Sequence, residues 1–155
     1  MTQTPMRAFL GFVAGALAIL TFHQGLVEAL HLLGLAPQAA FRTTPVMPLN
    51  VPTIVSLCFW GGLYAMVFNI IRPHLRVPLW LCGLGLGLVS AAISMVIIAP
   101  IKGNPIAFDG QTWPIVRSLL VNGFWGLGVI TILPLLQPRP LVSTDLGGSR
   151  ASHAT

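Results

Sequence analysis

Four long apolar runs constrain this sequence more than any other feature. They cover residues 8–34, 52–71, 78–99 and 114–136. A helix rises about 1.5 Å per residue and the hydrocarbon core of a bilayer is about 30 Å thick, so about 20 apolar residues can cross it. Only 7% of the 155 residues are charged, whereas soluble domains have about a quarter. The sequence therefore predicts an all-α, integral membrane four-helix bundle within residues 1–137.

The first run also carries most of the polar side chains expected at membrane depth. Gln24, Glu28 and His31 follow one another at i, i+4 and i+7, so they lie on one face of a helix, with His23 to one side. Glu28 is the only acid in any of the four runs. A membrane acid indicates function by default, because burying its charge near the helix centre costs about 2.5–3.5 kcal/mol.

A structural role for Glu28 is the alternative. With helices one and four antiparallel, Glu28 and Arg117 come to nearly the same depth, and Asn122 lies deeper in the fourth helix. An ion pair between Glu28 and Arg117, or a hydrogen bond to Asn122, would join the first and fourth helices and offset the cost of burying the charge.

The basic residues set the orientation. If the N-terminus is cytoplasmic, Arg42, Lys102 and Arg117 lie outside, and a larger group lies inside. That inside group consists of Arg7, Arg72, Arg76, Arg139 and Arg150. Because cytoplasmic loops carry the excess of Lys and Arg, both termini are expected in the cytoplasm, with Asp109 in an outer connection. The basic residues are scattered, so no nucleic-acid partner is expected.

Small residues predict close contacts between helices. Gly11 and Gly15 form a G-x-x-x-G step in the first run, although ordinary span composition also produces this spacing. Gly83, Gly87 and Ala91 form a ridge at spacing four in the third run. We expect the third helix to be a close-packed interior helix.

An internal repeat is a further hypothesis. Residues 58–73 can be laid on 123–138 without a gap, and both segments contain Phe-Trp-Gly. The two halves would then be parallel hairpins related by an axis along the membrane normal. Chance is the alternative, since apolar spans draw on few residue types. Residues 138–155 are rich in Ser, Thr, Gly and Ala and are predicted to be a disordered cytoplasmic tail.

The chain resembles an uncharacterised family of small bacterial four-span membrane proteins. The resemblance rests on Leu20-Thr-Phe-His-Gln-Gly25, Phe59-Trp-Gly-Gly62, Pro100-Ile-Lys-Gly-Asn-Pro-Ile-Ala107 and Asn122-Gly-Phe-Trp-Gly126. It implies the four-span topology and a bacterial inner-membrane location, and it implies no activity.

Metal and haem chemistry lack the residues they need. Glu28 and His31 form an E-x-x-H pair, which resembles half of a di-iron site, but such a site needs about four carboxylates. Haem ligation by His23 or His31 would require a second copy of the chain, because the other runs contain no histidine. No cofactor is therefore expected.

Three functional hypotheses remain. The first is a non-enzymatic structural or accessory component of the membrane, in contact with lipid and with a second copy or an unidentified membrane partner. The second is a small proton- or cation-coupled transporter that acts as a homodimer through Glu28, since an acid in a first span loosely resembles the small multidrug transporters. A membrane enzyme or a haem-binding protein is the third.

Overall fold

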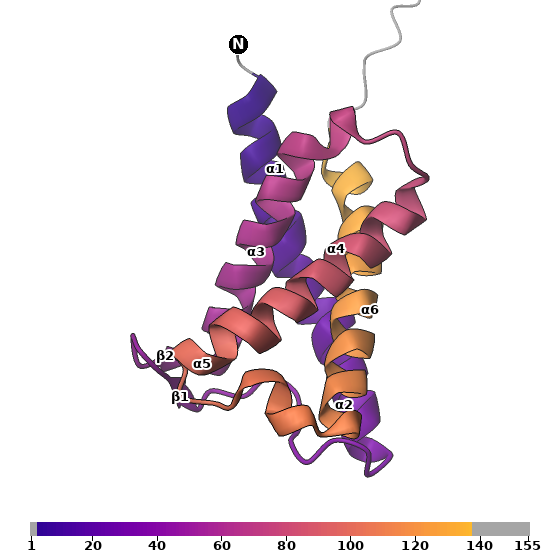
Figure 1. The fold of residues 1–155 in the computed structure, drawn as a ribbon. Helices are drawn as coiled ribbons and strands as arrows, with labels where there is room; N and C mark the ends of the chain where they lie inside the picture. The colour runs from indigo at the N-terminus through magenta and orange to yellow at the C-terminus, as the bar shows by residue number, and fades with distance from the viewer. Residues whose placement is uncertain (1–2, 138–155) are drawn as a thin grey trace, which may run out of the picture.

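The computed structural model describes residues 3–137, which form a bundle of four long apolar helices (Figure 1). Helices long and apolar enough to cross a membrane cover Thr4–Leu32, Thr53–His74, Leu79–Ile101 and Thr112–Leu136. The predicted all-α, four-span membrane fold is therefore confirmed. The predicted tail, 138–155, lies outside the described residues.

Two of the four spans contain a π turn. The first span consists of α1 (Gln3–Ala18), the π turn η1 (Ile19–His23) and α2 (Gln24–Leu32). The second span is α3 (Thr53–Ile71) and the fourth is α6 (Thr112–Leu136). The third consists of α4 (Leu79–Ile93), the π turn η3 (Ser94–Ile98) and α5 (Ala99–Ile101). A π turn inserts one extra residue into a helix and is frequent at functional sites.

The helix bounds differ from the predicted runs mainly at the amino ends. The first helix begins at Gln3 and not at 8, because polar residues extend a helix beyond its apolar stretch. The fourth helix begins at Thr112, two residues before its apolar run, and Gln111 holds the cap position without a side-chain hydrogen bond. The structure places α3 and α4 within one or two residues of their predicted starts.

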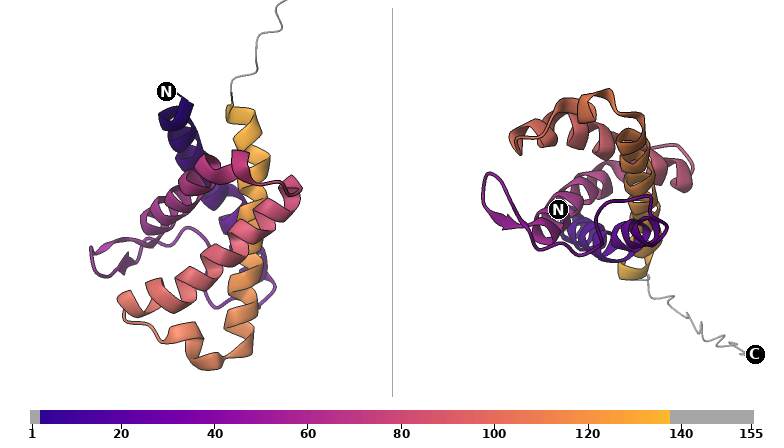
Figure 2. Two further views of the ribbon diagram at one scale, coloured as in Figure 1. Left: turned by 45° about the horizontal axis from the view of Figure 1, so that its top comes forward. Right: turned by 90° about the horizontal axis from the view of Figure 1, so that it is seen from below.

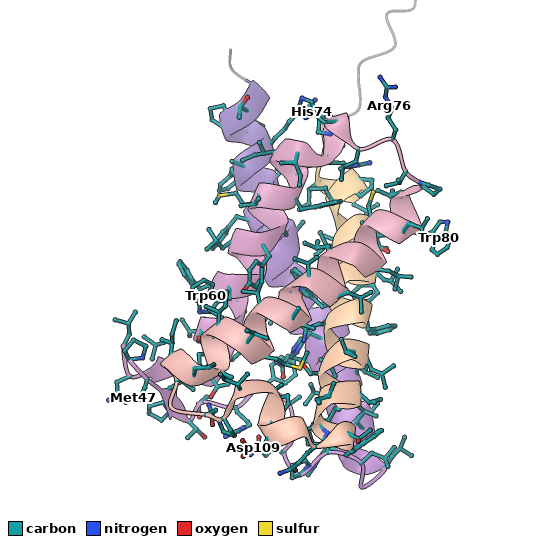
Figure 3. All side chains as sticks on the ribbon, viewed as in Figure 1. Met47, Trp60, His74, Arg76, Trp80 and Asp109 are labelled. Atoms are coloured by element: carbon teal, nitrogen blue, oxygen red, sulfur yellow. The ribbon has the colours of Figure 1, made fainter. Side chains whose placement is uncertain are left out.

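The connections gather at two ends of the bundle. The start of α1, the short helix η2 (Arg72–His74) and the end of α6 lie at one end, which we call the turn end (Figure 1). The connections 33–52 and 102–111 lie at the other, which we call the loop end. Figure 3 places His74 and Arg76 at the turn end, and Met47 and Asp109 at the loop end.

Each loop-end connection contains local structure. A two-residue hairpin in the first connection pairs β1 (Pro45–Val46) with β2 (Val51–Pro52) in an antiparallel register. The second connection contains the 3₁₀ turn η4 (Ile106–Gly110). Figure 2 shows the β1–β2 hairpin projecting from the side of the bundle, whereas the rest of the first connection runs beneath the helix ends. The part of the first connection outside the hairpin therefore covers the loop end of the bundle.

Glycines bring the helices together on the turn-end side. A Cβ atom added at Gly15 would collide with the carbonyl oxygen of Gly61 on α3, and one added at Gly126 would collide with that of Gly83 on α4. Gly11 has similar backbone contact with α3. The structure thus confirms the close approach predicted from the first G-x-x-x-G step and from the small-residue ridge of the third span.

Trp125 connects the α4–α6 pair of helices to the α1–α3 pair. Its side chain is only 1% exposed, and its Nε1–H donates a 3.0 Å hydrogen bond to the backbone oxygen of Gly15. Ala14, Ala18 and Val129 pack in the same buried cluster. Helix α1 therefore contacts both α3 and α6, whereas α4 crosses α6 obliquely at the edge of the bundle (Figure 1). The third helix is thus closely packed on α6, but the prediction that it lies in the interior is wrong.

Candidate functional site

A cavity of about 230 Å³ opens at the loop end. Its walls come from η1, α2, α3 and α6, and from the connections that cover these helices. The polar residues that line it are His23, Gln24, Gln38, Arg42, Thr53, Arg117, Ser118 and Asn122. Apolar residues, among them Val27, Leu30 and Val121, complete the lining. The cavity thus combines an apolar wall with several polar groups, as ligand sites do.

The polar face of the first span holds the first connection in place. The side-chain oxygen Oε1 of Gln24 accepts a 2.8 Å hydrogen bond from the backbone N–H of Phe41. The carboxylate oxygen Oε2 of Glu28 accepts a 2.8 Å hydrogen bond from the N–H of Ala40. Both acceptors therefore satisfy backbone N–H groups that no helix or strand would pair.

Further hydrogen bonds hold the same connection. The Nδ1–H of His31 donates to the carbonyl oxygen of Ala36 at 2.9 Å, since that oxygen can only accept. The indole N–H of Trp113 donates to the carbonyl oxygen of Leu35 at 2.8 Å, which ties the connection to α6. The segment over the cavity is therefore attached to the bundle on two sides.

The predicted ion pair between Glu28 and Arg117 is wrong. Within residues 3–137 neither residue forms an ion pair, and the Glu28 carboxylate binds the connection instead. Asn122 does not bind Glu28 either: its Nδ2 donates to the backbone oxygen of Ser118 at 2.8 Å, and its Oδ1 accepts from Ser90 at 3.3 Å. The prediction considered only depth along the membrane normal, and side chains at the same depth need not be in contact.

The cavity separates the predicted site residues into two groups. Those that line it are His23, Gln24, Asn122, Arg117 and Arg42. Those that do not line it are Glu28, His31, Lys102 and Asp109. The structure therefore brings the first group together, whereas Glu28 and His31 support the connection that covers the cavity.

His23 lies deepest among the cavity residues of the first span. It ends the π turn η1, is only 8% exposed, and has its Nδ1 3.4 Å from the Nε2 of Gln24. A second cavity of about 30 Å³ begins beside it and shares His23 and Asn122 with the first. Ser90 and Tyr64 line its far side. A space of this size admits about one water molecule, and apolar groups form most of its wall.

Strained backbone lies beside the cavity. Phe108, which lines it, has a φ of 55°, and its neighbours Ala107 and Asp109 also have positive φ. Phe41, whose N–H binds Gln24, has a φ of 55° as well. Residues other than glycine pay about 1–3 kcal/mol for such conformations, which cluster at ligand sites. Both loop-end connections are thus strained where they meet the cavity.

Lys102 and Asp109 lie outside the cavity at the same end. The Nζ of Lys102 donates a 3.2 Å hydrogen bond to the hydroxyl of Ser56 on α3, and partial burial lowers the pKa of this lysine. Asp109 is exposed at the surface of η4 (Figure 3). Neither residue therefore acts on a molecule in the cavity by direct contact.

Sequence reasoning missed three polar residues of the cavity: Gln38, Thr53 and Ser118. Only Ser118 had a local signal in the sequence, because it is the neighbour of Arg117.

No group of three or more His, Cys, Asp or Glu side chains that could hold a metal occurs within 3–137. No protein-family model, curated protein or solved structure matches this chain.

Proposed function

We propose that this multi-pass membrane protein binds a small solute in the loop-end cavity and takes part in solute transport. The cavity of about 230 Å³ is the observation that carries the proposal. Ligand pockets for drug-sized molecules measure about 300–1,000 Å³, so the solute is smaller than these. Its polar groups would meet the arginine and amide side chains, and its apolar part would meet Val27, Leu30 and Val121.

Two further features favour transport over simple binding. A small second cavity continues past His23 toward the middle of the bundle, where Ser90 and Asn122 contribute polar groups to a mainly apolar wall. The π turn η1 of the first span contributes Ile19 and His23 to the wall of this second cavity. Irregular helices at membrane depth are typical of transporter sites, because they line a polar cavity. This path would have to widen for a solute to follow it, because the second cavity admits about one water molecule.

The proposal moves the transport site away from Glu28. A homodimeric proton- or cation-coupled transporter would need this carboxylate in a water-lined cavity. Glu28 instead binds the N–H of Ala40 and does not line the cavity. Coupling through Glu28 is therefore not part of the proposed function.

The same geometry favours a second candidate, a structural or accessory role. The Gln24, Glu28 and His31 side chains all bind the chain's own first connection. Glycine contacts also close the turn-end half of the bundle. If the main role of the polar face is to hold the first connection on the bundle, the protein acts as a scaffold for a membrane partner. Such a scaffold would not require water in the cavity.

Water access distinguishes the two candidates. We would replace Val121 by cysteine in protein that also carries Cys58→Ser and Cys82→Ser, and treat it with a charged methanethiosulfonate reagent. The matched control is Val129→Cys, two turns further along α6 in the closely packed half, where the side chain is 0% exposed. Rapid modification at 121 and none at 129 supports the solute site. Equally slow modification at both positions supports the scaffold.

Membrane orientation is part of the proposal. We place the protein in a bacterial inner membrane with cytoplasmic termini, so that the cavity faces outward, because the turn end carries Arg7, Arg72 and Arg76. Asp109→Cys in the same cysteine-free background should react with an impermeant reagent added outside intact cells, and His74→Cys should not. The reverse pattern would place the cavity on the cytoplasmic side.

A further inference from the structure

We infer that the solute is an organic anion whose carboxylate or phosphate group is held between Arg42 and Arg117. This inference rests on the proposed function, in that it assumes a solute in the loop-end cavity. It adds the chemical class of that solute and names the two residues that would recognise it. Guanidinium groups present several N–H donors in a planar fork, which matches the oxygens of a carboxylate or a phosphate.

The charges around the cavity are unbalanced. Arg42 and Arg117 both line it, and no carboxylate does. The sequence has three acidic residues, of which Glu28 and Asp109 lie in the described part of the chain. Glu28 binds the N–H of Ala40, and Asp109 is exposed on η4. The groups that line the cavity therefore carry a net positive charge, so an anion is the solute it favours.

The two arginines differ in how they are held. Arg42 donates to the side-chain oxygen of Gln38, and its backbone oxygen accepts a 3.0 Å hydrogen bond from the N–H of Ile54 on α3. Gln24 fixes the preceding residue, Phe41. Arg42 is thus positioned from both sides, as a group that must hold a ligand in one place requires.

Arg117 comes from a different element of the cavity wall, helix α6. It lies in the second turn of α6, is half-buried, and its guanidinium has no hydrogen-bond or ion-pair partner within 3–137. The guanidinium nitrogens are not buried, yet no protein group within 3–137 provides them with acceptors, so their N–H groups are free to bind an anion in the cavity. An anion in the cavity would supply those acceptors and satisfy both arginines at once.

The size and the apolar wall limit the rest of the molecule. A volume of about 230 Å³ corresponds to about seven or eight water molecules at about 30 Å³ each. Val27, Leu30 and Val121 form an apolar surface beside the charged group. A compact molecule with one anionic group and a short apolar or aromatic body fits these features.

Three probes of nearly equal shape and different charge test the inference: benzoate, benzamide and benzamidine, which are negative, neutral and positive. We would measure their binding to the purified full-length protein in a neutral detergent by titration calorimetry. Benzoate should bind at least about tenfold more tightly than benzamide, because charge-assisted hydrogen bonds are about twice as strong as neutral ones. Benzamidine should bind the weakest. Equal affinity for benzoate and benzamide would overturn the inference.

Variants then assign the effect to the two arginines. Arg42→Gln and Arg117→Gln should each weaken benzoate binding about tenfold and leave benzamide binding nearly unchanged. The matched control is Arg72→Gln at the turn end, far from the cavity, which should change neither. Each variant would first be checked for an unchanged melting temperature. If benzoate binding survived both cavity variants at full strength, the anion would not be held by these residues.

A third substitution separates this inference from the proposed function. Val121→Trp fills the cavity, whereas Leu120→Trp adds the same side chain at a half-exposed position one residue earlier. Suppose that benzamide and benzoate bind equally well to the original protein, and that Val121→Trp abolishes the binding of both while Leu120→Trp does not. The cavity then binds solutes but does not select anions. If no probe binds and no lipid is retained as described next, the inference fails together with the proposed function.

The anionic group could come from a free solute or from a phospholipid headgroup, and a lipid measurement separates them. We would transfer the protein from vesicles of phosphatidylglycerol or of phosphatidylcholine into the gas phase and record retained lipid by native mass spectrometry. Retention of phosphatidylglycerol that Arg42→Gln and Arg117→Gln abolish assigns the site to a headgroup phosphate. Arginine-dependent benzoate binding without such retention assigns it to a free anion, and either result supports the anion site.

Discussion

The turn-end half and the loop-end half of this bundle are built from the same four spans in opposite ways. In the turn-end half, the backbone of Gly126 touches that of Gly83, and Gly15 touches Gly61. In the loop-end half, the corresponding inward positions carry Gln24, Asn122 and Arg117, and a cavity of about 230 Å³ opens between the helices. One half is closed by residues without side chains, and the other is held open by polar ones.

This difference explains how a small membrane protein can hold a site. Helices in lipid gain little from the hydrophobic effect between them, so close contact through small residues supplies much of the stability. The turn-end half provides that contact and leaves the loop-end half free to bury polar groups at a cost. A binding site can therefore form in one half because the other half is closely packed.

The repeated Phe-Trp-Gly segment shows the same difference. Trp125 is 1% exposed and donates to the oxygen of Gly15, whereas Trp60 is only partly buried on α3 (Figure 3). Equivalent residues of the proposed repeat thus have different surroundings, because α6 lies inside the bundle and packs on two helices. The parallel-repeat relationship between the halves stays a prediction.

The largest effect is expected where the packed half has no room. Gly126→Ala adds a methyl group against the backbone oxygen of Gly83, which cannot rotate away as a side chain can. Overpacking of this kind costs about 3 kcal/mol, at the upper end of the usual range, because two helices must separate. The measurement is the free energy of unfolding in mixed detergent micelles.

Gly123→Ala is the matched control for this prediction. Gly123 lies on the same helix one turn away, and a Cβ atom there has nothing within 4 Å. Since alanine is the better helix former by about 0.5–1 kcal/mol, this variant should be as stable as the original or slightly more stable. Equal losses for the two variants would mean that glycine contact does not close the turn-end half.

The sequence predicted the packed half well and the open half poorly. Apolar run length placed α3 and α4 to within one or two residues, and glycine spacing predicted the contacts of Gly11, Gly15 and Gly83. These features depend on local pattern, because period and residue size fix them. Of the cavity's residues, the pattern of the first run predicted only a polar helix face with Gln24 on it and His23 to one side, and it did not predict a cavity.

The contacts that were not predicted in the loop-end half depend on how the two connections fold. Glu28 was assigned a side-chain partner on α6, yet its partner is a backbone N–H twelve residues away in the sequence. Gln38 and Phe108 reach the cavity because 33–44 and η4 fold back over the helix ends. Such contacts follow from backbone conformations of non-glycine residues with positive φ, which no periodic pattern predicts.

A smaller effect is expected for Glu28, in the open half. Glu28→Ala removes the acceptor of the Ala40 N–H and should cost about 1–2 kcal/mol, because that N–H is then left in a partly buried site. Glu28→Gln keeps a carbonyl acceptor and should cost less. The same detergent unfolding measurement applies.

A double-variant cycle tests the revised role of Glu28. Because Glu28 and Arg117 do not touch, the effects of Glu28→Gln and Arg117→Gln on the free energy of unfolding should add to within about 0.5 kcal/mol. A coupling of several kcal/mol would restore the ion pair and contradict the arrangement of the loop-end half.

The smallest effect concerns Lys102, the only lysine of the sequence, where the second connection leaves the third span. Burial lowers its pKa from 10.5, so the folded protein releases this proton at lower pH than the unfolded chain does. Stability should therefore rise slightly with pH from the lowered pKa up to about 10.5, since the unfolded chain binds more protons there. Lysine labelled with ¹³C gives one side-chain signal, whose titration in the folded protein should have a midpoint below that in unfolding detergent.

Ser56→Ala separates the effect of burial on this pKa from that of the hydrogen bond. The hydroxyl of Ser56 accepts from the charged Nζ, so removing it should leave the pKa of Lys102 low or lower it further. A titration at the unfolded value would mean that water reaches Lys102 freely and that the connection does not pack on α3.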